Sequence, residues 1–304
     1  MIHGLIAVDK EKGLSSHDVV DAIRKIFKIK KAGHFGALDP LATGLLLIAL
    51  GNATKFFSFY LKKEKQYAGT IEFGYGTTTY DSEGEPLGEK KEINLGNVDV
   101  AALLAAFSGP QTQIPPIYSA KKFKGRPLYY YARHPQSDRM GVVLRPVQVE
   151  IYHLEGKAVG PATLQFRALT SSGTYMRTLA HDIGQRLNVG AYLKELRRER
   201  IGEFSLDSAF TLEEIRHSAA AGDLRKVIIP IESLLPEFPK IIVSPAGCRD
   251  VGNGLPLQPE NILKLFPAAS NDNFRLFDEE GKFLAIARKN ASRIGFKPYI
   301  VFPD

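Results

Sequence analysis

The sequence is poor in cysteine and has no long, uninterrupted apolar run. Its single cysteine, Cys248, rules out an intramolecular disulfide, which fits a reducing compartment. The most apolar segment, LATGLLLIALG, is too short to span a bilayer and carries glycines. The first residues lack the basic start and long apolar core of a secretory signal. Together these absences predict a soluble, cytoplasmic protein.

Several common catalytic and ligand-binding patterns are also missing. There is no G-x-x-x-x-G-K-[ST] phosphate loop and no G-x-S-x-G nucleophile elbow, and GYGTTTY lacks the third glycine of a dinucleotide fingerprint. The seven histidines form no H-x-x-x-H pair, and one cysteine cannot build a thiolate zinc site. DSEGE at 81–85 is too short for a calcium loop and is typical of an exposed acidic turn. We therefore expect any catalysis to use side chains alone, without a cofactor or metal.

The composition is that of a globular protein with a basic surface. With 304 residues and 44% hydrophobic residues, the chain can build one large domain and one small one. The formal net charge is +7, yet residues 241–304 hold 8 basic and 7 acidic residues, so the excess lies in the first 240. Such a surface is either simply solvated or binds a polyanion, nucleic acid being the first candidate.

Hydrophobic periodicity divides the chain into helices and strands. LLLIALG, YAGTIEFG, VQVEIYHLE and ATLQFRALTSS have the pattern of strands, whereas GTYMRTLAHDIGQRL has that of a helix. Regular signals fade between about 111 and 145, and a segment of that length is usually functional or mobile. After residue 240, short strands and tight turns predict a small all-β unit of roughly 60 residues. Helix N-caps are expected at Ser15, Asn52, Asn97 and Thr211, the first and last within capping boxes.

A single acid, Asp39, stands in the otherwise small or apolar segment AGHFGALDPLATGLLLIALGNATKF. Pro40 favours extended backbone at Asp39, and the glycines around it let the backbone approach a ligand closely. An Asp-Pro turn that merely ends a strand would look the same. The segment alone therefore leaves catalysis and simple turn formation both open.

The same segment closely resembles the signature of the bacterial tRNA pseudouridine-55 synthases, the TruB family, which runs G-H-x-G-x-L-D-P-x-A-x-G-x-L, then an apolar strand and G-x-A-T-K. The resemblance continues through AVDKEKGLSSHDVV, KQYAGTIEFG, IPPIYSAKKFKGRPLYYYAR, SSGTYMRTLAHDIGQRL and ELRRERIGEF. It implies an α+β pseudouridine synthase domain over 1–240, with a mixed, mostly antiparallel central sheet, a central active-site cleft and a thumb-like insertion at about 111–145. A small C-terminal β-barrel of the PUA type, an RNA-binding unit, is implied over 241–304.

The resemblance further implies isomerisation of uridine 55 in the T loop of tRNA to pseudouridine. Asp39 would be the carboxylate beside ribose C1′, and Arg177 the cation that pairs with it. Tyr67 would stack on the flipped uracil and take the C5 proton, Leu196 would line the base pocket, and His34 would fill the space that the base vacates. Taken alone, each of these residues also fits an ordinary structural position, Arg177 that of a surface arginine.

Basic clusters within the first 240 residues are expected to contact phosphates of the RNA. Affinity should then fall with salt, with a log–log slope of about −0.7 to −0.9 per phosphate contacted. The residues expected to contact RNA through their charge are Lys10, Lys121, Lys122, Lys124, Arg126, Arg197 and Arg198.

Phe35 is larger than its counterpart in many relatives and could pack in the core or line the approach of the RNA loop.

Two other functions remain open at the level of the sequence. One is a tRNA-folding chaperone whose catalysis is secondary, and the other is a guide-dependent rRNA pseudouridine synthase of the dyskerin type. The expected partner is the T-arm stem-loop of tRNA. We expect a monomer that needs no membrane and no obligate protein partner.

Overall fold

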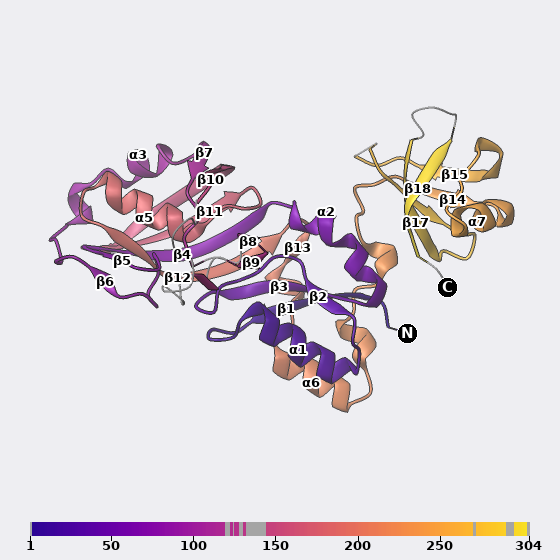
Figure 1. Ribbon diagram of the computed structural model, residues 1–304, viewed down its shortest axis with the longest axis horizontal. Helices are drawn as coiled ribbons and strands as arrows, with labels where there is room; N and C mark the ends of the chain where they lie inside the picture. Colours follow the sequence, from indigo (N-terminus) through magenta and orange to yellow (C-terminus); the bar gives the residue numbers. More distant parts are fainter. Residues whose placement is uncertain are drawn as a thin grey trace.

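The chain folds around one large sheet, and a smaller sheet follows near the C-terminus (Figure 1). The computed structural model describes residues 2–118, 122–123, 125–127, 130–131, 144–269, 272–289 and 295–302. Within these ranges, nine strands form the large sheet: β1 (Gly4–Lys10), β2 (Ala32–His34), β3 (Thr43–Leu50), β4 (Lys65–Phe73), β7 (Gly109–Gln113), β10 (Val147–Gly160), β11 (Thr163–Thr170), β12 (Ala191–Ile201) and β13 (Phe204–Ser205).

The large sheet is mixed but mostly antiparallel, as the sequence predicts. Its main order is β1-β3-β12-β4-β11-β10-β7, with β2 beside β3 and β13 beside β12. Among the described strands of this sheet, only β3 and β12 run parallel, and they pair only at Arg197↔Thr43 and Arg198↔Gly44. This short parallel contact joins the two halves of the sheet, so it fixes the distance between residues carried by β3 and residues carried by β12.

Helices pack on one face of the large sheet towards both of its ends. Val19, Leu104, Leu179 and Ile215, one from each of four helices, belong to the same buried apolar cluster. In Figure 1, α3 and α5 lie beside β7, β10 and β11 at the left, whereas α1 and α6 lie below β1 and β3. The α-helices that the structure describes outside the C-terminal unit are α1 (Ser16–Phe27), α2 (Phe57–Leu61), α3 (Val100–Ala105), α5 (Met176–Arg186) and α6 (Leu212–Ala220).

Two of the four predicted N-caps are correct. Ser15 and Thr211 cap α1 and α6, each within a complete capping box. The prediction for Asn52 is wrong: the chain tightens into a 3₁₀ helix over Gly51–Phe56 before α2, and the Asn52 backbone N–H donates to His3 Nδ1 at 3.0 Å. The prediction for Asn97 is also wrong, because Asp99 accepts from the Ala102 N–H at 2.9 Å and caps α3.

Short elements connect the larger ones. Two ribbons, β5 (Gly76–Thr77) with β6 (Pro86–Leu87) and β8 (Lys122–Phe123) with β9 (Arg126–Pro127), lie outside the large sheet. Most of the predicted thumb-like insertion at about 111–145 lies outside the described residues. Further 3₁₀ turns occupy Leu95–Asn97, Leu206–Ser208, Leu224–Val227, Ile231–Ser233 and Pro259–Asn261.

In its described residues, the C-terminal unit is a five-stranded sheet, in the order β15-β14-β16-β17-β18, with one α-helix. The prediction of an all-β unit is therefore wrong in one respect, because the unit contains α7 (Pro245–Gly252), whose N-cap Ser244 accepts from the Gly247 N–H through its side chain. The strands are β14 (Lys240–Val243), β15 (Ile262–Phe266), β16 (Phe274–Phe277), β17 (Phe283–Lys289) and β18 (Phe296–Val301).

Part of the C-terminal unit shares an apolar core with the large sheet. Phe283 and Phe302 belong to the same buried cluster as Leu5 of β1, Leu47 of β3 and Phe56 beside α2. This cluster covers the face of β1 and β3 that points away from α1 and α6. No helix among the described residues has both the length and the apolar character that a bilayer crossing requires.

Candidate active site

Asp39 lies in the connection between β2 and β3, at the point where the sheet divides. β3 pairs with β2 at one end and with β12 at the other, so the connection emerges between these two partners. Gly36 in this connection has φ +115°, which favours glycine because the left-handed region is strained for residues with a Cβ. The sharp turn brings Asp39 back over the ends of β4 and β12.

Hydrogen bonds from α1 and β12 fix this connection. The Ser16 hydroxyl accepts from the Leu38 N–H at 2.8 Å and donates to the Leu38 carbonyl at 3.1 Å. Arg198 donates to the carbonyls of Gly36 at 3.0 Å and Ala37 at 3.2 Å. The backbone on both sides of the turn is thereby held by groups that are far away in the sequence.

Phe35 anchors the same connection in the core. It is buried, and its ring lies parallel to that of Tyr60 with 5.3 Å between the centroids. Of the two positions that the sequence left open for Phe35, the structure therefore shows the core position. The larger side chain serves to hold the backbone next to Gly36.

Arg177, on the first turn of α5, forms an ion pair with Asp39. The distance from Arg177 Nε to Asp39 Oδ2 is 2.9 Å, and the side chains are 6% and 41% exposed, respectively. The expectation for Arg177 from the helix pattern alone, a surface position, is wrong. It is buried because the helix N-terminus points into the cleft beside Asp39. The structure thus brings together the acid and the cation that the motifs single out.

A second carboxylate, Asp81, holds the other side of the same guanidinium. Arg177 Nη1 lies 3.4 Å from Asp81 Oδ2 and donates to the Thr79 carbonyl, while Nη2 donates to the Tyr118 carbonyl at 2.7 Å. Asp81 is buried. The reading of 81–85 as an exposed acidic turn is therefore wrong for its first residue, because the turn folds back and buries Asp81 against Arg177.

A cavity of about 270 Å³ opens directly above this ion pair. Asp39 and Arg177 line it together with Tyr67 of β4 and Leu196 of β12. Tyr67 and Leu196 are both nearly buried and point to the face of the sheet that carries α5. The cavity is large enough for a single nucleobase. Four of the residues expected at the active site therefore meet in one place.

The electrostatic environment of Asp39 combines opposing effects. Burial raises the pKa of the Asp39 carboxyl above its ordinary value, the charge of Arg177 opposes this rise, and Asp81 adds to it. Among these effects, the charge of Arg177 is the strongest one that favours the ionised form of Asp39.

His34, the last residue of β2, lines a neighbouring cavity of about 660 Å³ that also reaches Asp39. Its Nδ1 atom is buried and has no hydrogen-bond partner among the described residues. Burial lowers the pKa of His34, and the charges of Arg198 and His17 lower it further. The imidazole is therefore neutral at physiological pH, and it stands at the edge of the cleft that leads to the acid.

Two of the residues expected to contact RNA are buried and support the active-site connection instead. Lys10 is fully buried, and its Nζ donates to the carbonyls of Leu14 at 2.7 Å and Pro40 at 3.4 Å. Burial lowers the pKa of Lys10 to about 8, against the opposing charge of Asp39. Arg198 is 1% exposed, and each of its three nitrogen atoms donates to a carbonyl. The expectation that Lys10 and Arg198 bind phosphates at the surface is wrong for both.

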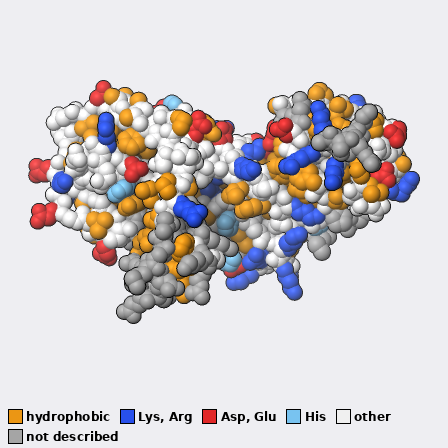
Figure 2. Space-filling view, turned by 45° about the horizontal axis from the view of Figure 1, so that its top comes forward, with side chains coloured by type: hydrophobic (Ala, Val, Ile, Leu, Met, Phe, Trp, Pro, Cys, Tyr) orange, Lys and Arg blue, Asp and Glu red, His pale blue; other side chains and the backbone are white. Residues whose placement is uncertain are grey.

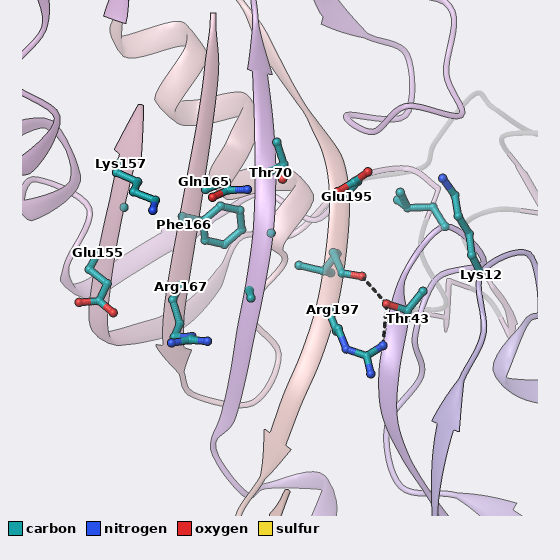
Figure 3. A pocket seen from close by; sticks show the side chains of 15 residues that line it. Lys12, Thr43, Thr70, Glu155, Lys157, Gln165, Phe166, Arg167, Glu195 and Arg197 are labelled. Carbon is teal, nitrogen blue, oxygen red and sulfur yellow. Dashed lines mark hydrogen bonds between the residues drawn. The ribbon is translucent and has the colours of Figure 1, made fainter. Parts of the chain in front are cut away.

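Arg197 lies on the other face of the large sheet, because neighbouring residues of a strand point in opposite directions. It donates to Asp9 Oδ2 at 2.6 Å and to the Thr43 hydroxyl at 3.3 Å. Figure 3 shows this face, which carries a cavity of about 840 Å³. Its charged lining is mixed: Lys12, Glu155, Lys157, Arg167, Glu195 and Arg197. This cavity lacks Asp39, Arg177 and Tyr67, so it is separate from the candidate active site.

The remaining expected RNA contacts cannot be compared with the structure. Lys121 and Lys124, and the side chains of Lys122 and Arg126, lie outside the described residues. On the surface that Figure 2 shows, Lys and Arg side chains gather along the middle of the molecule, from the hollow between the two lobes to the lower edge. Asp and Glu lie mainly at the outer margins of this view.

Two polar residues at the site were not expected from the sequence. Asp81 directly follows the GYGTTTY loop, and this position could have identified it as a site residue. The short acidic run in which it lies predicted an exposed turn instead. Lys65, which is 6% exposed and lines the 270 Å³ cavity, lies two residues before Tyr67 on β4. The period of a strand places residues two apart on the same face, so the position of Tyr67 could have identified Lys65.

Comparisons with known proteins agree with this geometry. Residues 24–176 match the model of the TruB family pseudouridylate synthase N-terminal domain, and residues 177–236 match that of the tRNA pseudouridylate synthase B C-terminal domain. A tRNA pseudouridine synthase B of Solibacter usitatus (strain Ellin6076) is 44% identical over 83% of this chain and 84% of its own length. The protein of that name from Bacillus subtilis (strain 168) is 38% identical over 94% and 93%.

A solved structure of an H/ACA RNP bound to a substrate RNA containing 2′-deoxyuridine includes a chain with the same fold. It is similar to this chain with a TM-score of 0.74 and 25% identity, over 99% of this chain and 85% of its own. The match extends over the large sheet and the C-terminal sheet together. The predicted α+β pseudouridine synthase fold is therefore confirmed.

Proposed function

This chain belongs to the TruB family of pseudouridylate synthases, and from that premise we propose that it isomerises uridine 55 in the T loop of tRNA to pseudouridine. The observation that carries the proposal is the ion pair between Asp39 and Arg177, 2.9 Å long, at the floor of a cavity of nucleobase size. An ionised carboxylate beside a base pocket is the group that this reaction requires.

The chemistry explains why one carboxylate suffices. The reaction breaks the bond between ribose C1′ and uracil N1, and the electron pair of that bond stays with the base. Positive charge develops on the sugar, as in glycoside hydrolysis, and a carboxylate beside C1′ stabilises it. The base then turns, C5 bonds to C1′, the C5 proton leaves and N1 takes up a proton. Asp39 faces the ribose in this scheme.

Three residues would prepare the site for this step. Arg177 keeps Asp39 ionised and holds its carboxylate in one orientation. Tyr67 offers an aromatic face to the uracil, and stacking of this kind contributes about 1–3 kcal/mol per base. Its hydroxyl takes the C5 proton in this scheme, and Leu196 closes the apolar side of the pocket. The base thereby has one apolar wall, one aromatic wall and one charged floor.

The target base must leave its stack before it can reach Asp39. Extrusion costs a few kcal/mol, and less in a loop than in a duplex. The neutral imidazole of His34, at the edge of the cleft, is suited to fill the space that the base leaves. We propose that the T-arm stem-loop lies across this edge, where the cleft opens to solvent.

We also propose that the two parts of the chain have different roles. Residues 1–240 form the catalytic domain, with the insertion at about 111–145 closing on the RNA as a thumb, and residues 241–304 form a PUA-like unit that contacts RNA. The basic excess of the first part supports this division. We further propose that the protein acts in the cytoplasm as a monomer, without an obligate protein partner.

Release of tritium from [5-³H]uridine-labelled tRNA tests the proposed function. The wild-type protein should release one tritium per tRNA, and Asp39→Ala should release none above background. If the wild type releases no tritium, the proposed function is wrong. Turnover on an isolated T-arm stem-loop, with no other protein present, would exclude dependence on a guide RNA. If Asp39→Asn, expressed in cells, retained the full cellular benefit, tRNA folding assistance would be the main role.

A further inference from the structure

The cations around the base cavity differ in the number of carboxylates that pair with them. Arg177 faces two carboxylates, Asp39 and Asp81. Lys65 and Arg198 line the same cavity, yet neither forms an ion pair with any carboxylate in the described part of the chain. Burying an unpaired charge is costly and is seldom retained without a use. The part of the cavity that Lys65 and Arg198 line therefore carries positive charge that no carboxylate pairs with in the described residues.

Lys65 has a hydrogen-bonding position to spare. It is the first residue of β4 and lies on the same face as Tyr67. Its Nζ donates to the carbonyls of Leu61 at 3.0 Å and Lys63 at 2.6 Å, at the end of α2. An ammonium group has three N–H donors, so these two bonds leave one. Arg198 donates from each of its three nitrogen atoms to a carbonyl, which holds its guanidinium in one place.

Both cations border the loop that carries the catalytic acid. A methyl group placed on Gly36 would lie 3.7 Å from Lys65 Cε and 3.9 Å from Arg198 Nη1. Burial and, to a smaller extent, the charge of Arg198 lower the pKa of Lys65 to about 8. The ammonium therefore remains charged at neutral pH, although its burial disfavours the charged form. A fixed positive charge in a cavity with little water exerts a strong field on whatever enters it.

We propose that Lys65, supported by the charge of Arg198, stabilises the uracil anion that is formed when the C1′–N1 bond breaks. This inference rests on the proposed function and adds a residue to it. The electron pair of the broken bond gives the base one negative charge, spread over N1, O2 and O4. The anion persists while the base turns, until C5 bonds to C1′, the C5 proton leaves and N1 is protonated. A cation in the cavity stabilises this species more than the neutral uridine, so it accelerates cleavage.

The first test compares Lys65→Met with Lys62→Met in single-turnover pseudouridine formation. Lys62 is exposed and three residues away, so it is a matched control for the loss of one lysine. We expect the rate constant of Lys65→Met to fall on the order of a hundredfold, the effect of removing one preorganised electrostatic group. The dissociation constant for tRNA should change less than about threefold, because the anion is absent from the ground state. Lys62→Met should behave as the wild type.

A leaving-group test separates charge stabilisation from a structural role at the end of α2. Fluorine at C5 withdraws electrons, so 5-fluorouracil carries a negative charge more readily than uracil. The ratio of wild-type to Lys65→Met cleavage rates should therefore shrink, from about a hundredfold with uridine to below about tenfold with 5-fluorouridine at position 55. Loss of 5-fluorouridine from nuclease digests, followed by mass spectrometry, measures cleavage even though fluorine blocks the loss of the C5 proton.

The outcomes are distinct. An unchanged ratio with the two bases would show that Lys65 only holds the end of α2, and this would overturn the inference. Wild-type rates in Lys65→Met would overturn it as well. If Lys65→Met does not fold, Lys65→Gln keeps an N–H donor for the carbonyls of Leu61 and Lys63 and undergoes the same two measurements. If the wild type itself leaves uridine unchanged, the proposed function fails, not this inference alone.

Discussion

At the scale of single residues, Arg177 is defined by four acceptors that approach one guanidinium from different directions. Two are the carboxylates of Asp39 and Asp81, and two are the carbonyls of Thr79 and Tyr118. A planar fork of five N–H donors fits such a set, whereas a lysine ammonium has only three donors at one point. The identity of the residue is therefore as important as its charge.

Replacement of Arg177 by lysine should abolish most activity while leaving the fold intact. The ammonium keeps a positive charge near Asp39 but cannot also bind Asp81 and both carbonyls. We expect tritium release to fall by at least about a hundredfold and the free energy of unfolding by only about 1–3 kcal/mol. Arg186→Lys, on the exposed last turn of the same helix, is the control. Normal turnover by Arg177→Lys would show that the ion pair has no catalytic role.

Asp81→Asn tests whether the second carboxylate positions Arg177. The amide can still accept hydrogen bonds from Thr79 and Glu83 N–H, but it no longer offers a charge to the guanidinium. Arg177 would then be free to shift, so we expect kcat to fall about tenfold or more with little change in KM. The exposed Asp207→Asn is the control. A rise in KM with kcat unchanged would instead place Asp81 in substrate binding.

At the scale of elements, the local patterns were predicted well and the burial of polar residues was not. Capping boxes and strand alternation depend on residues a few positions apart, so Ser15, Thr211 and the strands β3, β4, β10 and β11 could be predicted. The motif segments also located Asp39, Arg177 and Tyr67. The roles of Lys10 and Arg198 depend on carbonyls 30 and 161–162 residues away, respectively, and no local pattern contains that information.

The short parallel contact between β3 and β12 also depends on one glycine. Gly44 has φ +101°, and a Cβ at this position would lie 2.3 Å from the Arg198 carbonyl oxygen and 2.8 Å from its nitrogen. Both the backbone conformation and the close approach of β12 require glycine here. Since Arg198 also holds the connection that carries Asp39, this contact couples the assembly of the sheet to the geometry of the active site.

Gly44→Ala should therefore weaken both the fold and the activity. The added methyl group would push β12 away from β3, and we expect the free energy of unfolding to fall by about 2–4 kcal/mol. Activity should fall further than stability explains, because the connection around Gly36 moves with Arg198. Gly33→Ala, where a Cβ meets nothing within 4 Å, is the control for denaturant unfolding. Equal stability of the two variants would contradict the coupling.

At the scale of the whole molecule, aromatic side chains fix the C-terminal sheet to the large sheet. The rings of Phe56 and Phe302 stack with 5.1 Å between their centroids, and Phe283 packs edge-on against Phe302 at 5.0 Å. Lys55 adds a hydrogen bond from its Nζ to the Val301 carbonyl at 2.5 Å. The Lys55 contact links residues 246 positions apart, and Phe56 and Phe302 are as distant in the sequence, so the two sheets should unfold together as long as this cluster is intact.

Phe302→Ala tests that coupling. Deletion of a buried phenylalanine ring typically costs about 3–5 kcal/mol, because apolar burial is lost and a cavity remains. Here the cavity would lie between the two sheets, so calorimetry should show one transition in the wild type and two in the variant, with the C-terminal sheet unfolding first. Phe266→Ala, on the exposed edge strand β15 of the same sheet, should keep the single transition. A single, uniformly lowered transition in Phe302→Ala would show that other contacts hold the sheets together, and a separate C-terminal transition in the wild type would show that the cluster never coupled them.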